Sequence, residues 1–405
     1  MPNIDSDLQK LLGPDRRKLP LPTGLGRVVI GIAILNLVGL VALWPTEQPA
    51  IDLTTFGFAS DAVNASVVSR DKGPCSYSDE LDCIAIHFQL EDATSVDDGL
   101  IVDFEQSDEP GQTEFAVGDR VFMLAVDHGD GTLSYQYGTH DRRPLLLILT
   151  VVFGAVVALL GRWRGVAALA GLAFSIAVLF LFILPAIIAG TDAVLIALVG
   201  GGAIALVSLY LAHGYTPLTH VATLGAFSAL VLTTGLSWVV VSLARFTGLG
   251  TEEAFYLLAI PNLDLNGLLL AGIVLGAIGA LDDVTVTQAS AVWEVRKANP
   301  SLGPKDLYAA GIRVGRDHIV STVNTLLLAY VGVSLPLLIL FNLSGQPLGV
   351  VASSEVIAVE IVRTLVGSIG LVAAVPVTTW LGSHVVHSAR PRHLRGEGGA
   401  DDPVS

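Results

Sequence analysis

Long apolar runs recur along the chain at lengths that suit a membrane better than a soluble core. An α-helix needs about 20 apolar residues to cross the roughly 30 Å hydrocarbon layer of a bilayer. Runs of this order cover residues 28–44, 144–160, 166–188, 193–212, 219–244, 267–292, 319–341 and 357–382. The pattern predicts a polytopic α-helical membrane protein with about eight transmembrane helices.

Residues 46–141 follow a different pattern, in which apolar and polar positions alternate over short stretches. These stretches are "IAIHFQL" (84–90), "LIVDFEQ" (100–106), "DRVFMLAV" (119–126) and "LSYQY" (133–137). Alternation with a period of two is typical of half-buried strands, and the segments between them are rich in turn residues. We therefore expect a small β-rich domain directly after the first helix.

The apolar runs and the alternating region together predict how the chain is divided. We expect an N-terminal tail (1–27), an anchor helix (28–44), a β-rich domain (46–141), a seven-helix membrane domain (144–382) and a C-terminal tail (383–405). The first run could be a secretory signal, but no small-residue cleavage site follows Trp44 and Pro45, so a retained anchor is favoured.

Arginine and lysine residues predict the orientation, because short loops that carry them stay in the cytoplasm. Four basic groups lie within residues 16–27, 162–164, 296–316 and 390–395. With eight spans, all four groups fall on the same side of the membrane. Both termini are then cytoplasmic, and residues 46–141 are extracytoplasmic.

Composition excludes several functional classes. The chain is 52% hydrophobic and only 15% charged, which does not suit an ordinary soluble domain. Its net charge of −15 comes mainly from acids within residues 46–141. We find no basic and aromatic stretch typical of nucleic-acid binding, no phosphate-binding loop and no metal-ligand spacing. We therefore expect no nucleic-acid partner, no metal and no cofactor.

Cys75 and Cys83 are the only cysteines in the chain, and both fall in the predicted exported domain. Disulfides form and persist in oxidising compartments outside the cytoplasm. We expect these two residues to form a disulfide that closes one loop. Two unpaired thiols are the alternative.

Two adjacent acids, Asp282 and Asp283, lie within the apolar run 267–292. The residues after them carry no charge until Glu294, and Trp293 provides the aromatic anchor expected at the interface. The acids are therefore predicted to lie near the middle of a helix. An ionised carboxylate costs about 2.5–3.5 kcal/mol there, and such residues usually mark a proton or ion pathway.

Helical spacing extends this pair into a candidate proton relay. Residues at i, i+4, i+7 and i+11 share one face of a helix, and starting at Asp283 these are Asp283, Thr287, Ser290 and Glu294. The next apolar helix carries a counterpart formed by Asp317, Ser321 and Asn324. We expect the two stripes to face each other across a chain of water molecules. The alternative is that the two acids only hold helices together, with one acid permanently protonated.

Other polar residues are weaker candidates. Histidines 213, 220, 384 and 387 are expected to lie solvated near helix ends rather than to bind metal. Glu360 and Arg363 are three residues apart on one predicted helix and are expected to form a structural ion pair.

Two motifs that follow one another along the chain resemble the YibE/F family of bacterial multi-pass membrane proteins. They are "GAIGALDDVTVTQASAVWEVRKANP" (276–300) and "GIRVGRDHIVSTVNTLLLAYVG" (311–332). The resemblance runs from about Pro144 to about Gly382, and the preceding anchor and β domain resemble the family's exported portion. It implies a location in the bacterial cell membrane. It implies no role for any single residue.

A looser similarity is to permeases of the resistance-nodulation-division type, which also carry an acidic pair on a membrane helix. Those permeases usually continue into an acidic "EN" element, whereas Ala289 and Ser290 stand at that spacing here. Eight spans also do not fit their six-span unit.

These features favour a proton-coupled transporter, or a transport accessory protein, that uses the acidic pair. The expected partners are the lipid bilayer, an unidentified small molecule or ion, and a second membrane subunit or a second copy of the chain. The competing hypothesis is a non-transporting envelope scaffold or sensor whose exported domain binds a ligand or a protein. An enzyme is not expected, because an intramembrane aspartyl protease would need two acids on different helices.

Overall fold

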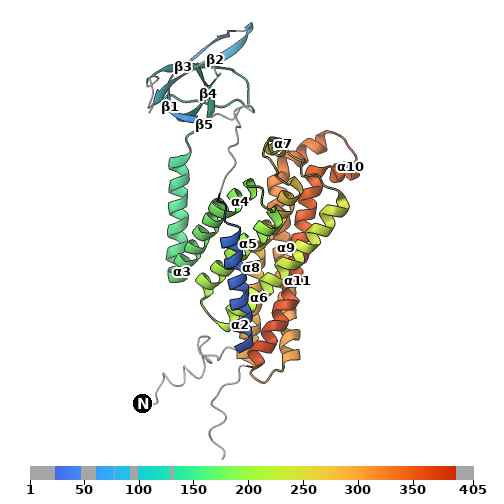
Figure 1. The fold of residues 1–405 in the computed structure, drawn as a ribbon. Coiled ribbons are helices and arrows are strands. Elements are labelled where there is room, and N and C mark those ends of the chain that lie inside the picture. Colours follow the sequence, from blue (N-terminus) through green and yellow to red (C-terminus); the bar gives the residue numbers. More distant parts are fainter. Residues whose placement is uncertain (1–22, 47–60, 77, 92–98, 128–131, 389–405) are drawn as a thin grey trace, which may run out of the picture. The chain divides into compact units, whose positions relative to one another are not determined.

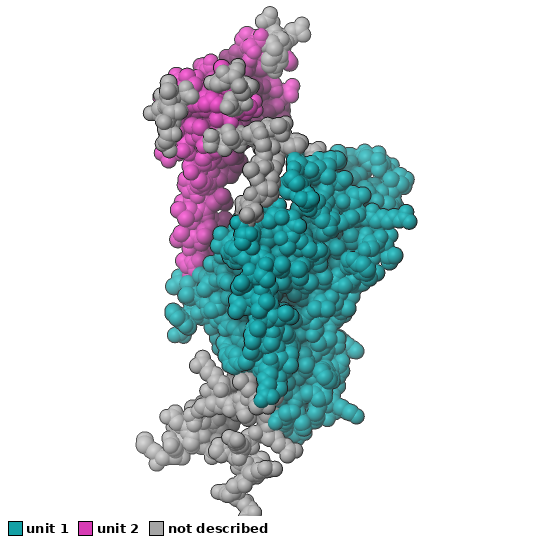
Figure 2. Space-filling model, in the orientation of Figure 1, with its two compact units in different colours: residues 1–49, 157–405 teal, residues 50–156 magenta. Residues whose placement is uncertain are grey.

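The computed structural model describes residues 23–46, 61–76, 78–91, 99–127 and 132–388 (Figure 1). The chain forms two compact units, one of residues 1–49 and 157–405 and the other of residues 50–156 (Figure 2). We call them the helical unit and the sheet unit. Most of each predicted tail lies outside the described residues, and residues 23–27 of the predicted N-terminal tail (1–27) belong to the first helix instead.

The sheet unit is built on a five-stranded antiparallel sheet with strand order β3-β2-β1-β4-β5. Its strands are β1 (Asp61–Cys75), β2 (Ser78–Glu91), β3 (Ile101–Ser107), β4 (Arg120–Asp127) and β5 (Leu133–His140). The four segments predicted from alternation correspond to β2 to β5, so the expectation of a β-rich unit is confirmed. Strand β1 was not predicted, because its sequence is largely polar.

Aromatic side chains form the core of the sheet unit. The ring of Phe115 lies 5.4 Å from that of Phe88 and 4.9 Å from that of Tyr137, both in edge-on geometry. Phe88 comes from β2 and Tyr137 from β5, at opposite sides of the central strand. Edge-on aromatic pairs contribute about 0.5–1.5 kcal/mol beyond their burial, so these rings help to fix the curvature and register of the sheet.

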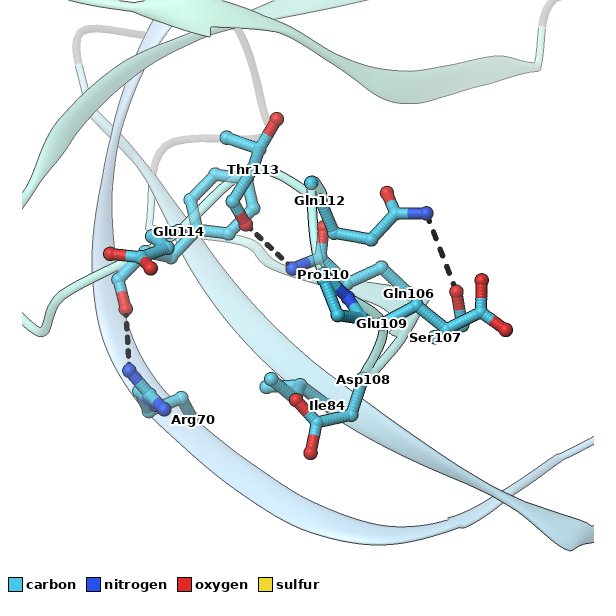
Figure 3. A pocket seen from close by; sticks show the side chains of 12 residues that line it. Arg70, Ile84, Gln106, Ser107, Asp108, Glu109, Pro110, Gln112, Thr113 and Glu114 are labelled. Atoms are coloured by element: carbon cyan, nitrogen blue, oxygen red, sulfur yellow. Dashed lines mark hydrogen bonds between the residues drawn. The ribbon is translucent and has the colours of Figure 1, made fainter.

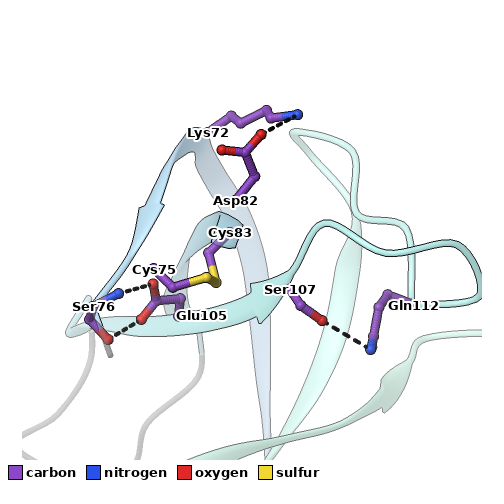
Figure 4. Close-up of a disulfide and its surroundings, with 8 residues drawn as sticks. All are labelled: Lys72, Cys75, Ser76, Asp82, Cys83, Glu105, Ser107 and Gln112. Atoms are coloured by element: carbon purple, nitrogen blue, oxygen red, sulfur yellow. Dashed lines mark hydrogen bonds and ion pairs between the residues drawn. A yellow bond between two sulfur atoms is a disulfide. The ribbon is translucent and has the colours of Figure 1, made fainter. Parts of the chain in front are cut away.

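A disulfide closes the end of the β1–β2 hairpin. Cys75 and Cys83 are bonded to each other, with their Cα atoms 4.8 Å apart. Glu105 on β3 lies beside them and accepts hydrogen bonds from the hydroxyl and the backbone N–H of Ser76 (Figure 4). These two bonds lower the pKa of the Glu105 carboxyl, with the hydroxyl bond as the larger cause. The third strand is thereby connected to the end of the hairpin.

The helical unit consists of long helices joined by short connections. The segments are α2 (Thr23–Ala42), α3 (Arg143–Val178, which begins within the sheet unit), α4 (Leu184–Ile188), α5 (Ala193–His213), α6 (Pro217–Ala244), α7 (Glu252–Leu257), α8 (Leu265–Ala298), α9 (Pro304–Leu343), α10 (Leu348–Ser353) and α11 (Glu355–Ser388). A π-helical turn, Leu179–Ile183, joins α3 to α4. Within the described residues, seven helices are long and apolar enough to cross a membrane.

The sequence predicted eight such helices, and the difference lies in one segment. Arg143–Ile188 forms a helical run of 46 residues, where two spans were predicted. At about 1.5 Å per residue this run would be more than twice as long as the roughly 30 Å hydrocarbon layer is thick. It is broken at Arg162, whose φ of 51° and ψ of −136° are not helical. The polar sequence "GRWRG" (161–165) therefore interrupts the helix without adding a separate loop.

Helix α8 is the central element of the helical unit, because it packs against α5, α6, α9 and α11. Glycines allow these close approaches. A Cβ atom on Gly201 of α5 would lie 2.1 Å from Cδ1 of Ile278 on α8, and one on Gly225 of α6 would lie 2.1 Å from Oγ1 of Thr378 on α11. Small residues at helix contacts are the usual device for tight packing in membranes, where apolar burial alone does not drive helices together.

Substitution of Gly225 by alanine is expected to destabilise the helical unit. The added methyl group would overlap Thr378, and overpacking of this kind costs about 1–3 kcal/mol. Gly235 lies on the same helix with no atom within 4 Å of the position of its Cβ, so Gly235→Ala is the matched control. Heating both variants in detergent should show a lower midpoint of aggregation for Gly225→Ala only. Equal midpoints would contradict the close α6–α11 packing.

Lowering the pH is expected to weaken the hydrogen bonds between Glu105 and Ser76 beside the Cys75–Cys83 disulfide. Because the folded pKa of Glu105 lies below its ordinary value of 4.5, its contribution to stability is complete above that value and is lost as pH falls through the folded pKa. Opening of the Cys75–Cys83 bond by a phosphine reductant should therefore accelerate below pH 4.5 in the wild-type protein. Glu105→Gln should lack this acceleration, and Glu109→Gln should retain it. The same pH profile in all three proteins would refute the role of Glu105.

Candidate functional site

The adjacent acids of α8 lie in two different environments. Helix α8 turns one face into the bundle, where Leu281, Val284 and Thr285 are buried. Asp282 lies at the edge of this face and is half-buried, whereas the side chain of Asp283 is 68% exposed. Their different exposure follows from the 100° turn per residue of an α-helix, which directs neighbouring side chains to different sides.

Asp282 has a buried carboxylate oxygen with no donor. Its Oδ1 atom has no hydrogen-bond partner among the residues that the structure describes. Its backbone carbonyl accepts a bond of 3.2 Å from the hydroxyl of Thr285, one turn further along the helix. A buried carboxylate oxygen without a donor is costly, so this atom is a candidate for binding a proton or a cation.

Asp283 faces a histidine on the next helix. Nε2 of His318 on α9 lies 3.9 Å from Oδ2 of Asp283, so the two side chains form an ion pair when the imidazole is protonated. His318 was not predicted as a site residue from the sequence, although it directly follows Asp317 in "GRDHIV". Its side chain is 30% exposed. A histidine beside a carboxylate is a common arrangement for proton transfer at neutral pH.

The expectation that polar stripes on α8 and α9 face each other is wrong. Asp317, Ser321 and Asn324 are exposed and lie away from the helices that α9 packs against. The buried positions of α9 among the described residues are Leu307, Gly311 and Gly315. The physical reason is that glycines permit the closest helix approach, so the glycine side of α9 packs inward and the polar side is turned out.

The other predicted relay residues on α8 share the side of Asp283. Thr287 and Glu294 are exposed, and Ser290 is half-buried. At the cytoplasmic end predicted for this helix, a carboxylate oxygen of Glu294 lies 4.0 Å from the amine of Lys297. The predicted α8 stripe therefore exists as a continuous polar edge, which lies on the surface of the bundle rather than in its interior.

Gln288 lies on the opposite, buried face of α8 and joins three helices. Its side chain is 2% exposed, and its amide nitrogen donates to the carbonyl of Gly311 on α9 at 2.8 Å and to Oγ1 of Thr379 on α11 at 2.6 Å. The Thr379 hydroxyl in turn donates to the carbonyl of Val375 at 2.6 Å. Sequence reasoning missed Gln288 because it is uncharged, although a polar residue on an otherwise apolar helix face could have indicated it.

A comparison with protein-family models decides the family. The model described as YibE/F-like protein matches residues 149–388, which is more than half of the chain and includes both motifs quoted above. The chain belongs to the YibE/F-like protein family.

The YibE/F-like chain was also compared with curated proteins and with solved structures. No curated protein and no solved structure matches it. The looser similarity to permeases of the resistance-nodulation-division type has no support from these comparisons. Family membership and the seven long apolar helices support a multi-pass membrane protein.

Further polar groups of the YibE/F-like domain lie beside α8 towards its N-terminus. Glu360 and Arg363 on α11 form the expected ion pair, at 2.6 Å. A Cβ on Gly272 would lie 3.7 Å from Nη2 of Arg363, and one on Gly276 would lie 3.1 Å from the hydroxyl of Tyr330 on α9. A cavity of about 150 Å³ between α9 and α11 is lined partly by Tyr330 and Glu360. Polar groups thus follow the exposed side of α8 over several turns.

Two histidines differ from the expectation that they are solvated, and one of them, His387, is half-buried, with a buried Nδ1 atom that has no hydrogen-bond partner among the described residues. His220 on α6 is fully buried, with Nδ1 2.6 Å from the hydroxyl of Tyr210 on α5, whereas it was expected to be solvated. The ring of Tyr215 packs against it edge-on at 4.4 Å. Short connections between α5 and α6 bring these three aromatic rings together and bury the histidine. His213 is exposed, as expected.

The sheet unit of the YibE/F-like chain has a pocket of about 490 Å³ beneath the loop after β3 (Figure 3). Arg70 donates to the carbonyl of Phe115 at 3.0 Å, and Gln106 donates to the carbonyl of Thr113 at 2.7 Å. These bonds hold the loop in place. Asp108, Glu109 and Glu114 add carboxylates to the lining.

Proposed function

We propose that the protein is a proton-coupled transporter, or a transport accessory protein, of the bacterial cell membrane. The observation that carries the proposal is the buried Oδ1 of Asp282, which has no donor in the described part of the chain and stands next to the Asp283–His318 pair. Intramembrane acids are costly and usually mark pathways for protons or ions. The transported species is a small molecule or an ion.

Protonation can change the contact between α8 and α9. When Asp283 is ionised and His318 is protonated, the opposite charges attract across 3.9 Å and hold the two helices together. Loss of the imidazole proton removes this attraction. A proton on Asp282 removes the charge of that carboxyl and supplies an O–H donor. Proton movement among these three groups thus biases a helix contact, which is the requirement for coupling.

The proposal includes the topology predicted from the basic residues. Both termini lie in the cytoplasm, and residues 46–141 lie outside it. Residues 143–188 cross the membrane twice, with the reversal at Arg162, which lies in one of the four basic groups. This arrangement restores eight crossings. The exported sheet unit then selects the substrate or docks a partner, and no enzymatic activity is assigned to the chain.

The second candidate function is a non-transporting envelope scaffold or sensor. The pocket of about 490 Å³ in the sheet unit favours it, because this pocket gives the exported part a binding surface of its own. The exposure of Asp283 and Glu294 also fits this alternative, since groups on the surface of a bundle can serve association instead of conduction. In that case the acids of α8 have no role in proton movement.

Proton flux into liposomes separates the two functions. The purified protein is reconstituted with a pH-sensitive dye inside the vesicles, a membrane potential is imposed, and the wild type is compared with the Asp282→Asn/Asp283→Asn double variant. We expect flux in the wild type and only the background of protein-free vesicles in the double variant. His318→Gln should reduce the flux, because the glutamine amide cannot take up a proton from one group and release it to another.

Asp306→Asn is the matched control, since this exposed acid in the first turn of α9 contributes nothing to the site. It should transport protons like the wild type. Equal flux in the wild type and the double variant, or no flux in either, would contradict proton coupling through the acidic pair and support the scaffold.

A further inference from the structure

Helix α9 presents polar side chains on the side turned away from the bundle. We call this surface the α9 polar face, and it comprises Arg313, Arg316, Asp317, Ser321 and Asn324, all exposed. From residue 316 to the end of α9 no side chain is fully buried, although Ile319 and Leu326 pack against the bundle core. The helix nevertheless has the length and hydropathy of a membrane span.

Contact with lipid does not suit the part of this surface that lies within the predicted span 319–341, which is Ser321 and Asn324. Arg313, Arg316 and Asp317 lie before that span, at its predicted cytoplasmic end, where water can solvate them, whereas an amide in hydrocarbon needs a hydrogen-bond partner. The side chains of Asn324 and Ser321 have no such partner among the described residues. Arg313, Arg316 and Asp317 likewise form no ion pair within the described part of the chain.

The other exposed spans differ from α9 in this respect. On α2, Asn36 is buried and donates to the carbonyl of Val199 on α5 at 2.9 Å. On α3, the hydroxyl of Thr150 donates to the carbonyl of Leu146 in its own helix at 2.8 Å. Arg27 on α2 and Arg162 and Arg164 on α3 are exposed near the ends of the predicted spans, and the outward sides between these ends are largely apolar and suit lipid. The polar side chains of α9 therefore indicate a protein partner for that helix in particular.

The α9 polar face is complementary to itself. Copies of one membrane protein share their orientation, so a two-fold axis along the membrane normal places each residue of α9 level with the same residue of the second copy. An asparagine amide both donates and accepts, so Asn324 can bond its counterpart. Asp317 would face the arginines of the other copy at positions 313 and 316. Gly332, with no atom within 4 Å of its Cβ position, leaves room for close approach.

We propose that two copies of this chain associate through their α9 helices, with paired Asn324 amides and with ion pairs between Asp317 of one copy and the arginines at positions 313 and 316 of the other. This association completes the polar surroundings of Asp317 and leaves the α8 acids beside the contact. The proposal does not depend on proton coupling. It rests on exposed side chains of α9, and these do not contact Asp282.

Disulfide cross-linking tests the association in native membranes. The chain has two cysteines, and both are joined in the Cys75–Cys83 bond, so an added cysteine provides a free thiol without background. Ser321→Cys and Leu328→Cys place the thiol on the outward side of α9, where Leu328 is 59% exposed. Mild oxidation should convert both variants to a species of twice the mass on a non-reducing gel.

Two control variants define the background. Leu326→Cys lies on α9 but packs against the bundle core, and Leu35→Cys on α2 is 73% exposed and reports random collision. Neither should cross-link. Asn324→Leu in the Leu328→Cys background should lower the cross-linked fraction severalfold, while Asn324→Gln, which keeps the amide, should preserve it.

Cross-linking of Leu328→Cys no greater than that of Leu35→Cys would overturn the proposal, and so would a yield that Asn324→Leu leaves unchanged. A different membrane protein as the partner of α9 would give the first of these results. Because no flux is measured, failure of proton coupling would not affect this test.

Discussion

The amide of Gln288 forms the interaction on which the arrangement of the helical unit depends. It donates from the C-terminal half of α8 to Gly311 on α9 and to Thr379 on α11, and the side chain of Gln288 is almost fully shielded from solvent. Hydrogen bonds of this kind fix rotation as well as distance, because an amide must point at its acceptors. With Gln288 directed inward, the rotation of α8 about its axis is set.

The position of the acids follows from that rotation. With Gln288 inside the bundle, Asp283, Thr287 and Glu294 fall on the outer side of α8, and Asp282 falls at the boundary. A proton pathway through these groups would run along the outer side of α8, next to α9, and not through the apolar interior. The glycines of α9 that allow the Gln288 contact also turn the polar side of that helix outward, where a second copy can meet it.

Sequence patterns could predict the elements whose burial is recorded in the order of apolar and polar residues along the chain. Apolar length identified the membrane helices, and alternation identified β2 to β5, because both patterns report burial directly. Strand β1 was not predicted because its sequence is largely polar, although backbone hydrogen bonds hold it between β2 and β4. Helical spacing correctly grouped Asp317, Ser321 and Asn324 on one face. It could not tell which neighbour that face meets, since the glycine contacts of α9 decide this. His318 was missed because its partner Asp283 lies on another helix, and Gln288 was missed because it is uncharged.

A double-mutant cycle between Gln288 and Thr379 tests this account most directly. The free energy of unfolding in mixed micelles would be measured for Gln288→Leu, Thr379→Val and the double variant. We predict a coupling of about 0.6–1.7 kcal/mol, in the range found for hydrogen bonds between membrane helices. Gln288→Leu combined with Thr364→Val, near the other end of α11, should be additive. Additivity of the Gln288 and Thr379 substitutions would show that the amide does not hold α8 in this rotation.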